Sequence, residues 1–386
     1  MKLVLFANTD WYLYNFRRSL ALALRDAGHE VLLLSPPGEY GERLRTLGLR
    51  WEPVAMERRS LAPWRELRLL WRLWRSFRRE RPDLVHGFTI KCAVYGALAA
   101  RLARVPARVA AVAGMGYVFT SDALRARALR PVVRWLLRLA LGGRGARLVL
   151  QNPDDVALFE RARLVEPARI RLIQGSGVDL RRFEPRGDDA RQGGPPRVLL
   201  ASRLLWDKGI AEYVDAARAL GDKAHCLLAG TPDPGNPAAI DVAQVRAWHE
   251  AGVIEWLGHV EDMPALLAGV DIAVLPSYRE GLPRSLIEAA ACALPLVATD
   301  VPGCRAVVTD GIDGLLVPAR DAQALAVAIG RLVDDPVAAR RLGRAARAKA
   351  LREFDERRVI ARTLEAYAEL LPGFARPGPE PRDGAG

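Results

Sequence analysis

The chain has 386 residues, with 57 Lys and Arg against 45 Asp and Glu and a formal net charge of +12. This length predicts two domains, each large enough for a hydrophobic core of its own. No uncharged apolar run reaches the roughly 18 residues of a membrane-spanning helix, and a strand-like segment begins at Lys2. We therefore expect neither a spanning helix nor a signal peptide, but a cytoplasmic protein. The four cysteines and five histidines are scattered, without the spacing of a metal or redox site.

The positive charge lies in one half of the chain. Residues 1–186 contain 34 Lys and Arg against 17 Asp and Glu, whereas the remainder contains 23 against 28. Such an excess is typical of proteins that bind nucleic acids or anionic membranes. Because it consists mostly of arginine in a chain rich in Ala, Leu and Arg, and is confined to one half, we expect a basic surface on the first domain and no nucleic-acid partner.

Strand-like and helix-like segments alternate in the first half, residues 1–186. This alternation is typical of a parallel, doubly wound sheet. The strands are expected at 2–7, 30–35, 84–87, 108–113, 147–151 and 170–173, with helices at 14–27 and 40–47. The polar, glycine-rich stretch 187–196 then predicts an interdomain linker.

The second half, residues 197–352, restarts the same alternation. Its strands are expected at 197–201, 224–229, 253–257, 271–275 and 295–299. Residues 353–371 predict a C-terminal helix that packs back on the first domain, and residues 372–386 a disordered tail. The predicted fold class is α/β, with two Rossmann-like domains that face each other across a cleft and bind ligands at the carboxyl ends of their strands. A dinucleotide enzyme is disfavoured because no Gly-x-Gly-x-x-Gly follows the first strand.

A strand, a loop and a helix start follow one another around Glu280. The apolar strand at 271–275 leads into the loop 277–282, and Pro283 stands where the first turn of a helix tolerates proline. A helix start offers free backbone N–H groups and a partial positive charge, which suit a phosphate or a polyhydroxyl ligand. Because Glu288 follows Glu280 by eight residues, one carboxylate can face a sugar while the other reaches a more distant pair of hydroxyls.

A second loop, after the strand at 197–201, contains Arg203 and Lys208. The first offers a planar fork of donors and the second a mobile point charge, so together they can hold a diphosphate from two sides. Taken alone, the two residues are equally typical of a solvated surface.

These two loops carry a family resemblance. Glu280 and Glu288, with Gly-Leu-Pro after the first, and Arg203 with Lys208-Gly209 resemble the donor-binding motifs of the retaining family 4 glycosyltransferases of GT-B fold. The resemblance extends through residues 227–230, 257–260 and 303–318 and covers residues 1–371. In particular, the chain is similar to bacterial enzymes that add N-acetylgalactosamine to undecaprenyl-diphosphate-linked diacetylbacillosamine, and to enzymes of O-antigen and capsule assembly.

The resemblance implies roles for the residues of both loops. Arg203 and Lys208 neutralise the diphosphate of the donor, and Glu280 positions the transferred sugar together with the amides of Gly281 and Leu282. In this family the departing phosphate helps to deprotonate the acceptor on the same face of the sugar. Glu280 is therefore expected to position the sugar and not to act as a nucleophile.

On the nucleotide side, Glu288 is expected to bond the ribose hydroxyls. The other donor-side residues implied are Gly230, His259, Val260 and Pro283. For His259, an ordinary loop histidine is an equally good interpretation. The donor is then a UDP-sugar and the acceptor a polyprenyl-diphosphate-linked saccharide. No Asp-x-Asp pair occurs in the chain, so no catalytic metal is expected. The resemblance implies no cofactor besides the donor substrate.

In the first domain, His86 and Lys91 flank the end of an expected strand. His86 is a candidate catalytic residue at the cleft, although a structural histidine is as good an interpretation, and Lys91 could meet a phosphate. A later loop resembles the acceptor-side loop of bacterial members that extend polyprenyl-diphosphate sugars, through Gly114, Gly116 and Tyr117. The glycine-rich first loop of the family is missing, and its place is taken by Asn8, Thr9, Asp10 and Tyr14.

The segment 61–81 predicts an amphipathic helix that could contact a membrane. At 100° per residue one side carries Trp64, Leu67, Leu70, Trp71, Trp74 and Phe77, and the other side carries arginines. Tryptophan and arginine on such a helix suit an anionic bilayer surface. The alternative is that the apolar side packs on the sheet. With the basic first half, the pattern favours peripheral association with the inner face of the plasma membrane.

Two other functions stay open at this point. A UDP-sugar epimerase of GT-B fold would use the same donor cleft, with acid and base carboxylates and no lipid acceptor. A non-catalytic membrane or nucleic-acid binding protein would explain the basic half but not the donor motifs.

Overall fold

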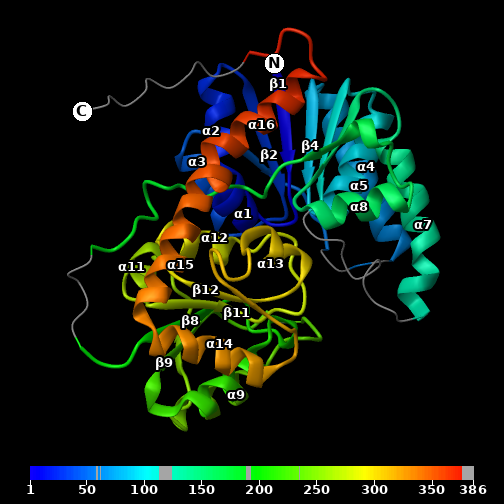
Figure 1. The fold of residues 1–386 in the computed structure, drawn as a ribbon. Helices are drawn as coiled ribbons and strands as arrows, with labels where there is room; N and C mark the ends of the chain where they lie inside the picture. Colours follow the sequence, from blue (N-terminus) through cyan, green and yellow to red (C-terminus); the bar gives the residue numbers. More distant parts are fainter. Residues whose placement is uncertain (58–59, 61, 113–123, 188–192, 234, 376–386) are drawn as a thin grey trace, which may run out of the picture. The chain divides into compact units, whose positions relative to one another are not determined.

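The computed structural model describes residues 1–57, 60, 62–112, 124–187, 193–233 and 235–375, with the backbone alone at 124–130 (Figure 1). The chain divides into two units. The first unit combines Met1–Ser176 with Arg358–Gly386, and the second is Gly177–Arg357. Each contains one parallel β-sheet with helices packed on it.

The sheet of the first unit has the strand order β3-β2-β1-β4-β5-β6-β7, and every neighbouring pair is parallel. Its strands are β1 (Lys2–Phe6), β2 (Glu30–Ser35), β3 (Arg50–Pro53), β4 (Leu84–Phe88), β5 (Ala107–Val112), β6 (Ala146–Leu150) and β7 (Ile170–Leu172). β3 was not among the expected strands because this four-residue edge strand is partly charged and ends in a proline. The strand order reverses between β1 and β4, which places the loops after these two strands at a switch point.

Both faces of this sheet are buried. Along β1, Leu3 and Leu5 belong to one hydrophobic cluster and Val4 and Phe6 to another, because successive side chains point to opposite faces. This is why the strands read as continuous apolar runs in the sequence. The helices that cover the sheet include α2 (Arg18–Asp26), α3 (Tyr40–Thr46), α4 (Pro63–Glu80), α5 (Ile90–Leu102), α7 (Leu124–Leu141), α8 (Pro153–Arg161) and α16 (Glu356–Ala368).

Helix α16 brings the end of the chain onto the first sheet. Its residue Tyr367 is fully buried in the cluster that contains Leu3 and Leu5. Just beyond the helix, the Glu369 carboxylate accepts from Arg147 at 2.7 Å and from Arg171 at 2.6 and 2.9 Å. Hydrogen bonds from these two guanidiniums, Arg171 first, lower the pKa of Glu369. The last helix is therefore held both by packing and by ion pairs to β6 and β7.

Helix α4 carries apolar side chains on two faces. Leu69, Leu73 and Phe77 pack in a cluster with Val4 and Phe6 of β1. The expected grouping of Phe77 with the tryptophans is wrong, because Phe77 is buried while the tryptophans are not. Only a narrow stripe of α4 packs against the sheet, and this stripe consists of positions 69, 73 and 77 at helical spacing.

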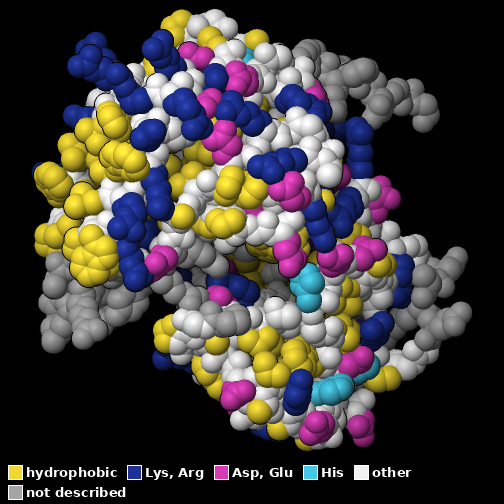
Figure 2. Space-filling model, turned by 180° about the vertical axis from the view of Figure 1, so that it is seen from behind, with side chains coloured by type: hydrophobic (Ala, Val, Ile, Leu, Met, Phe, Trp, Pro, Cys, Tyr) yellow, Lys and Arg dark blue, Asp and Glu magenta, His cyan; other side chains and the backbone are white. Residues whose placement is uncertain are grey.

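The second apolar face of α4 is exposed to solvent. Its side chains are Trp64, Leu67, Trp71 and Trp74, which we call the tryptophan face. Figure 2 shows hydrophobic side chains gathered beside Lys and Arg on the flank of the first unit where α4 and α7 lie. In the part of the chain that the structure describes, no helix is long and apolar enough to cross a bilayer.

The second unit is built around a six-stranded parallel sheet with the order β10-β9-β8-β11-β12-β13. Its strands are β8 (Arg197–Ala201), β9 (His225–Ala229), β10 (Glu255–Gly258), β11 (Ile272–Leu275), β12 (Leu296–Thr299) and β13 (Leu315–Val317). The helices are α9 (Ile210–Leu220), α10 (Val242–Glu250), α11 (Met263–Ala268), α12 (Arg284–Ala291), α13 (Pro302–Val307), α14 (Ala322–Asp334) and α15 (Pro336–Lys349). The order reverses between β8 and β11, where a parallel sheet of this kind binds its ligands.

Candidate donor site

The two motif loops of the second unit lie side by side at this switch point. One follows β8 and contains Arg203 and Lys208, and the other follows β11 and contains Glu280. The N–H of Tyr278 donates to the carbonyl of Asp207 at 2.9 Å and joins the two loops. The sequence motifs, more than 70 residues apart, therefore form one site.

Close approach of the two loops requires the glycine that follows Lys208. Gly209 has φ +69°, and a Cβ there would overlap the carbonyl oxygen of Pro276 in the neighbouring loop. Only glycine meets both demands, since it has no Cβ and adopts positive φ at little cost. Lys208 of the motif is thus positioned by the backbone turn at Gly209.

Lys208 and Glu280 form an ion pair between the two loops. Both side chains are largely buried, with exposed fractions of 18% and 13%. A buried pair of this kind is costly to break from one side, because the remaining charge loses its partner. The lysine ammonium is consequently held at a fixed place beside the loop that precedes α12.

Arg203 has a different partner, which the sequence analysis did not identify. Its Nη1 donates to Asp233 Oδ2 at 2.8 Å, and its side chain is 56% exposed. Asp233 belongs to the loop after β9. No sequence signal pointed to it, since a single aspartate in a Pro- and Gly-rich loop is typical of a turn.

Helix α12 begins at Arg284, so Pro283 is the residue just before the helix and not in its first turn. No side chain caps this helix start among the described residues. Glu288 lies one turn into the helix and accepts from Arg284 Nε at 2.7 Å. Its side chain is largely buried. The arginine is a second residue that the sequence analysis missed, although its four-residue spacing from Glu288 is a known signal for a helical ion pair.

A further layer of polar contacts supports the loop after β11. The Tyr278 hydroxyl donates to Glu212 Oε1 at 2.7 Å, and the guanidinium of Arg320 lies 4.5 Å from the centre of the tyrosine ring. Burial, then the hydrogen bond and charge of Glu212, raise the pKa of Tyr278 to about 12. The phenol thus stays a neutral donor at physiological pH and ties the loop to α9.

The residues expected to border the nucleotide lie at the ends of β9 and β10. Gly230 donates its N–H to the carbonyl of Gly258 at 2.7 Å and accepts from Trp256 Nε1 at 2.9 Å. A Cβ at Gly230 would overlap the carbonyl oxygen of Ser202, so this glycine also permits the approach of the Arg203 loop. After β10, His259 is exposed and Val260 half-buried, while Gly281 and Leu282 lie half-buried in the loop before α12.

In the first unit, two of the expected acceptor-side residues hold local structure. Thr9 accepts from the N–H of Tyr12 at 3.0 Å. The carboxylate of Asp10 accepts from the N–H groups of Trp11, Tyr40 and Gly41 at 2.8 to 3.0 Å and is buried. Asp10 thus caps the start of α3.

The remaining residues of the first loop lie nearby. The ring of Tyr14 packs on that of Tyr40 at 5.3 Å between ring centres. Asn8 is half-buried in the loop that follows β1.

His86 and Lys91 are both engaged within the first unit. His86 Nδ1 lies 2.6 Å from the hydroxyl of Tyr367, and the imidazole is buried. Burial, with a smaller effect of the nearby Arg17 charge, lowers the pKa of His86 well below its usual range, so the ring is neutral. Lys91 Nζ donates to Glu66 Oε1 at 2.8 Å and to two backbone carbonyls. These contacts favour the structural interpretation of His86. The expected residues Gly114, Gly116 and Tyr117 lie outside the described residues.

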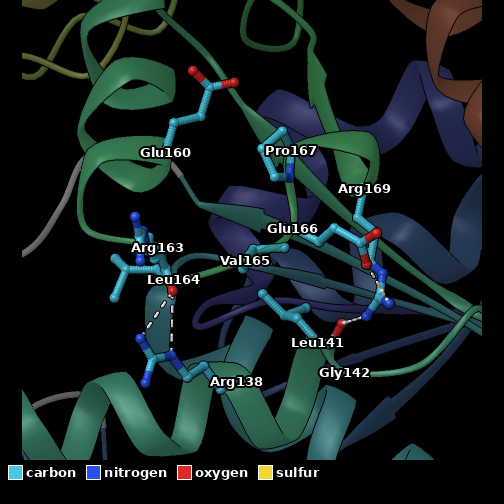
Figure 3. Close-up of a pocket in the computed structure, with 10 residues that line it drawn as sticks. All are labelled: Arg138, Leu141, Gly142, Glu160, Arg163, Leu164, Val165, Glu166, Pro167 and Arg169. Carbon is cyan, nitrogen blue, oxygen red and sulfur yellow. Dashed lines mark hydrogen bonds and ion pairs between the residues drawn. The ribbon is translucent and has the colours of Figure 1, made fainter.

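A hollow of about 500 Å³ also lies in the first unit, between α7 and α8 (Figure 3). Arg138 donates from Nε and Nη2 to the carbonyl of Arg163 at 3.2 and 3.0 Å. Arg169 donates to the carbonyl of Leu141 and pairs with Glu166. These two arginines are thus bonded to groups of the hollow itself, and none of the expected site residues lines it.

Comparisons with known proteins agree with this geometry. The family models described as "Glycosyl transferase 4-like domain" and "Glycosyl transferases group 1" match residues 15–175 and 195–335. The N,N'-diacetylbacillosaminyl-diphospho-undecaprenol alpha-1,3-N-acetylgalactosaminyltransferase of Campylobacter jejuni is 30% identical over 93% of this chain and 96% of the relative. The UDP-Gal:alpha-D-GlcNAc-diphosphoundecaprenol alpha-1,3-galactosyltransferase of Escherichia coli is 26% identical over 72% and 73%.

Solved structures match along nearly the whole chain. The Anabaena protein HepE in complex with UDP has a TM-score of 0.77 at 20% identity and covers 96% of this chain and all of its own. WaaG, a glycosyltransferase involved in lipopolysaccharide biosynthesis, has a TM-score of 0.73 at 15% identity and covers 97% and 100%. The fold is therefore GT-B, the fold of a large class of glycosyltransferases.

The chain belongs to the family 4 glycosyltransferases. This confirms the resemblance, the fold class and the enzyme class inferred from the sequence. The epimerase and the non-catalytic binding protein are not favoured, because the matching family models and both of these bacterial relatives are named as glycosyltransferases.

Proposed function

We propose that the protein transfers a sugar, with retention, from a UDP-sugar to a saccharide linked to polyprenyl diphosphate, and that the transferred sugar is an N-acetylhexosamine. The observation that carries the proposal is the ion pair of Lys208 with Glu280, which joins the two motif loops at the switch point of the second sheet, with Arg203 in the first of these loops. The nature of the substrates is supported by the names of the two bacterial relatives, both of which act on sugars linked to undecaprenyl diphosphate.

In the proposed reaction, a hydroxyl oxygen of the acceptor forms a bond to the anomeric carbon of the donor sugar. The bond from that carbon to the UDP oxygen breaks, and the hydroxyl proton passes to the departing phosphate. The diphosphate gains negative charge as it leaves, so the cations of Arg203 and Lys208 and the start of α12 stabilise the transition state more than the bound substrate. Glu280 holds Lys208 and positions the sugar.

The donor side can be tested with a panel of UDP-sugars and an undecaprenyl-diphosphate-linked mono- or disaccharide, by measuring UDP release and product mass. We expect release that depends on the acceptor and on one donor. Lys208→Ala should lower the rate at least 100-fold, because it removes a cation that acts on the departing phosphate and leaves Glu280 without its partner. Lys223→Ala is the matched control, since Lys223 is an exposed cation of the same unit that pairs with Asp334 at 3.6 Å. Turnover by Lys208→Ala at the wild-type rate would contradict the proposal.

We further propose that the first unit docks on the anionic inner face of the plasma membrane through α4. The tryptophan face is exposed: Trp64 by 65%, Trp71 by 52% and Trp74 by 37%. Arginines are interleaved with it along the helix, at positions such as Arg68 and Arg72. Exposed tryptophans are stabilised at the boundary of headgroups and acyl chains, and arginines by anionic lipids. A lipid-linked acceptor would be presented at that surface.

A further inference from the structure

The loop after β8, which contains Arg203 and Lys208, is joined by backbone hydrogen bonds to the segment that follows β9. The N–H of Leu204 donates to the carbonyl of Thr231, and the N–H of Ile240 donates to the carbonyl of Leu204, both at 3.0 Å. The N–H of Trp206 donates to the carbonyl of Ala238 at 2.8 Å. Residues 231–233 and 235–240, which we call the strap, thus hold the backbone of the loop from Leu204 to Trp206.

The strap also carries the partner of Arg203. Asp233 Oδ2 accepts from Arg203 Nη1 at 2.8 Å and from Asn236 Nδ2 at 3.1 Å. The N–H of Asn236 donates to the carbonyl of Asp233 at 3.0 Å, which closes a turn between the two residues. The carboxylate is only 14% exposed, in contrast to the arginine side chain. It is therefore fixed by its own segment before it orients the arginine.

A guanidinium has five N–H donors in a planar fork, and the pair with Asp233 uses one nitrogen, Nη1. Among the described residues, Asp233 is the only one that accepts a hydrogen bond from Arg203. The other edge of the fork, formed by Nε and Nη2, can then meet two oxygens of a phosphate. An exposed arginine without this anchor would have to be ordered by the ligand itself, which lowers affinity.

We propose that Asp233, held by Asn236, is the positioning residue that orients Arg203 for the donor diphosphate. This inference rests on the proposed function, since it assigns Arg203 to that diphosphate. The two cations of the site are then held in the same way. Each cation is held by one carboxylate from a different neighbouring loop, Lys208 by Glu280 and Arg203 by Asp233.

The test is a double-mutant cycle of Asp233→Ala and Arg203→Ala, with UDP affinity measured by calorimetry and kcat/KM measured with the donor. Ordering of one side chain is worth about three- to tenfold in affinity, so we expect Asp233→Ala alone to weaken UDP binding by that factor. In the Arg203→Ala background the same change should have no further effect, because Asp233 acts only through the arginine. Asp233→Asn, which keeps an acceptor oxygen, should restore part of the loss.

Asn236→Ala should act in the same direction with a smaller effect, also only when Arg203 is present. The matched control is Asp215→Ala, which removes an exposed carboxylate paired with Arg218 on α9 and should leave UDP affinity unchanged.

The possible failures are distinguishable. If the wild-type protein binds neither UDP nor any UDP-sugar, the proposed function fails and this inference fails with it. If the wild type binds UDP but Asp233→Ala weakens binding equally with and without Arg203, the residue supports the loop in general and the positioning role is overturned. Tighter UDP binding by Asp233→Ala would show that the carboxylate competes with the phosphate, which also overturns the inference.

Discussion

Replacing two tryptophans of α4 tests whether the first unit docks on a membrane. Trp71 and Trp74 are 52% and 37% exposed. With about 250 Å² for a whole tryptophan, they expose about 220 Å² together. At about 25 cal/mol per Å², removing this surface from water is worth about 5 kcal/mol. If half of the area enters the bilayer interface, Trp71→Ala with Trp74→Ala should weaken binding by about 2 to 3 kcal/mol, or about 30- to 200-fold.

The assay is co-sedimentation with vesicles that contain anionic lipid, compared with vesicles of neutral lipid alone. Wild-type protein should bind the anionic vesicles, and its binding should weaken with added salt, since arginines of α4 contribute through a screened attraction. The matched control is Val337→Ala, which truncates a 70% exposed apolar side chain in the second unit. The double variant should keep the wild-type rate on a short water-soluble acceptor, because the change lies in the first unit, outside the candidate donor site of the second.

Two results would refute this reasoning. Unchanged sedimentation of the double variant would show that the tryptophan face does not enter the bilayer. A change in oligomeric state on substitution, without a change in vesicle binding, would show that the face pairs with a second copy of the chain.

Three further predictions follow from the packing. Gly209→Ala should lower the midpoint of thermal unfolding and abolish UDP binding in calorimetry, because the methyl group would overlap the carbonyl of Pro276 at a positive φ; wild-type affinity would contradict the close approach of the two loops. Hydrogen bonds from Arg50 first, then Arg79 and Lys2, lower the pKa of Glu80 from 4.5 to about 2. Its stabilising effect is therefore complete above about pH 4.5 and is lost as the pH falls through 2, so urea unfolding should show Glu80→Gln less stable by about 3 kcal/mol at pH 7 and by less than half of that at pH 3; an equal difference at both pH values would argue against the ion pairs. All four cysteines are buried, and burial raises the thiol pKa of Cys226 to about 11 and those of Cys292 and Cys304 to about 12. An aromatic disulfide reagent should therefore label these thiols only after denaturation. One rapidly labelled thiol in the native protein would refute this prediction.

The strands could be predicted because parallel strands buried on both faces leave an apolar run in the sequence. The segment 197–201 matches β8 residue for residue, and 30–35 matches β2. The edge strand β3 escaped prediction because its four residues include Arg50 and Glu52, which form an ion pair and not a core contact. The packing of α4 could not be predicted from its hydrophobic periodicity. Both of its apolar faces fit the pattern of a helix that packs on a sheet, and the sequence does not show which of them is buried.

The donor motifs could be found from sequence, but their pairing could not. The charges of Lys208 and Glu280 suggested two separate contacts with a ligand, and only the backbone approach at Gly209 brings them together. Asp233 left no signal because its partner depends on the path of the strap. Asp10 was expected at the acceptor, yet its carboxylate is occupied by backbone N–H groups of α3, a contact that spans about 30 residues.

The return of the chain to the first sheet has a consequence for biosynthesis. The cluster on one face of that sheet includes Val359, Leu364, Tyr367 and Leu371, which leave the ribosome after every residue of the second unit. During translation, the second unit can therefore close its core while that face of the first sheet still lacks its covering helix. An apolar face left open for this time is a natural binding site for chaperones. A chain truncated at Arg357, at the start of α16, would therefore have a complete second unit but an uncovered apolar face on the first sheet.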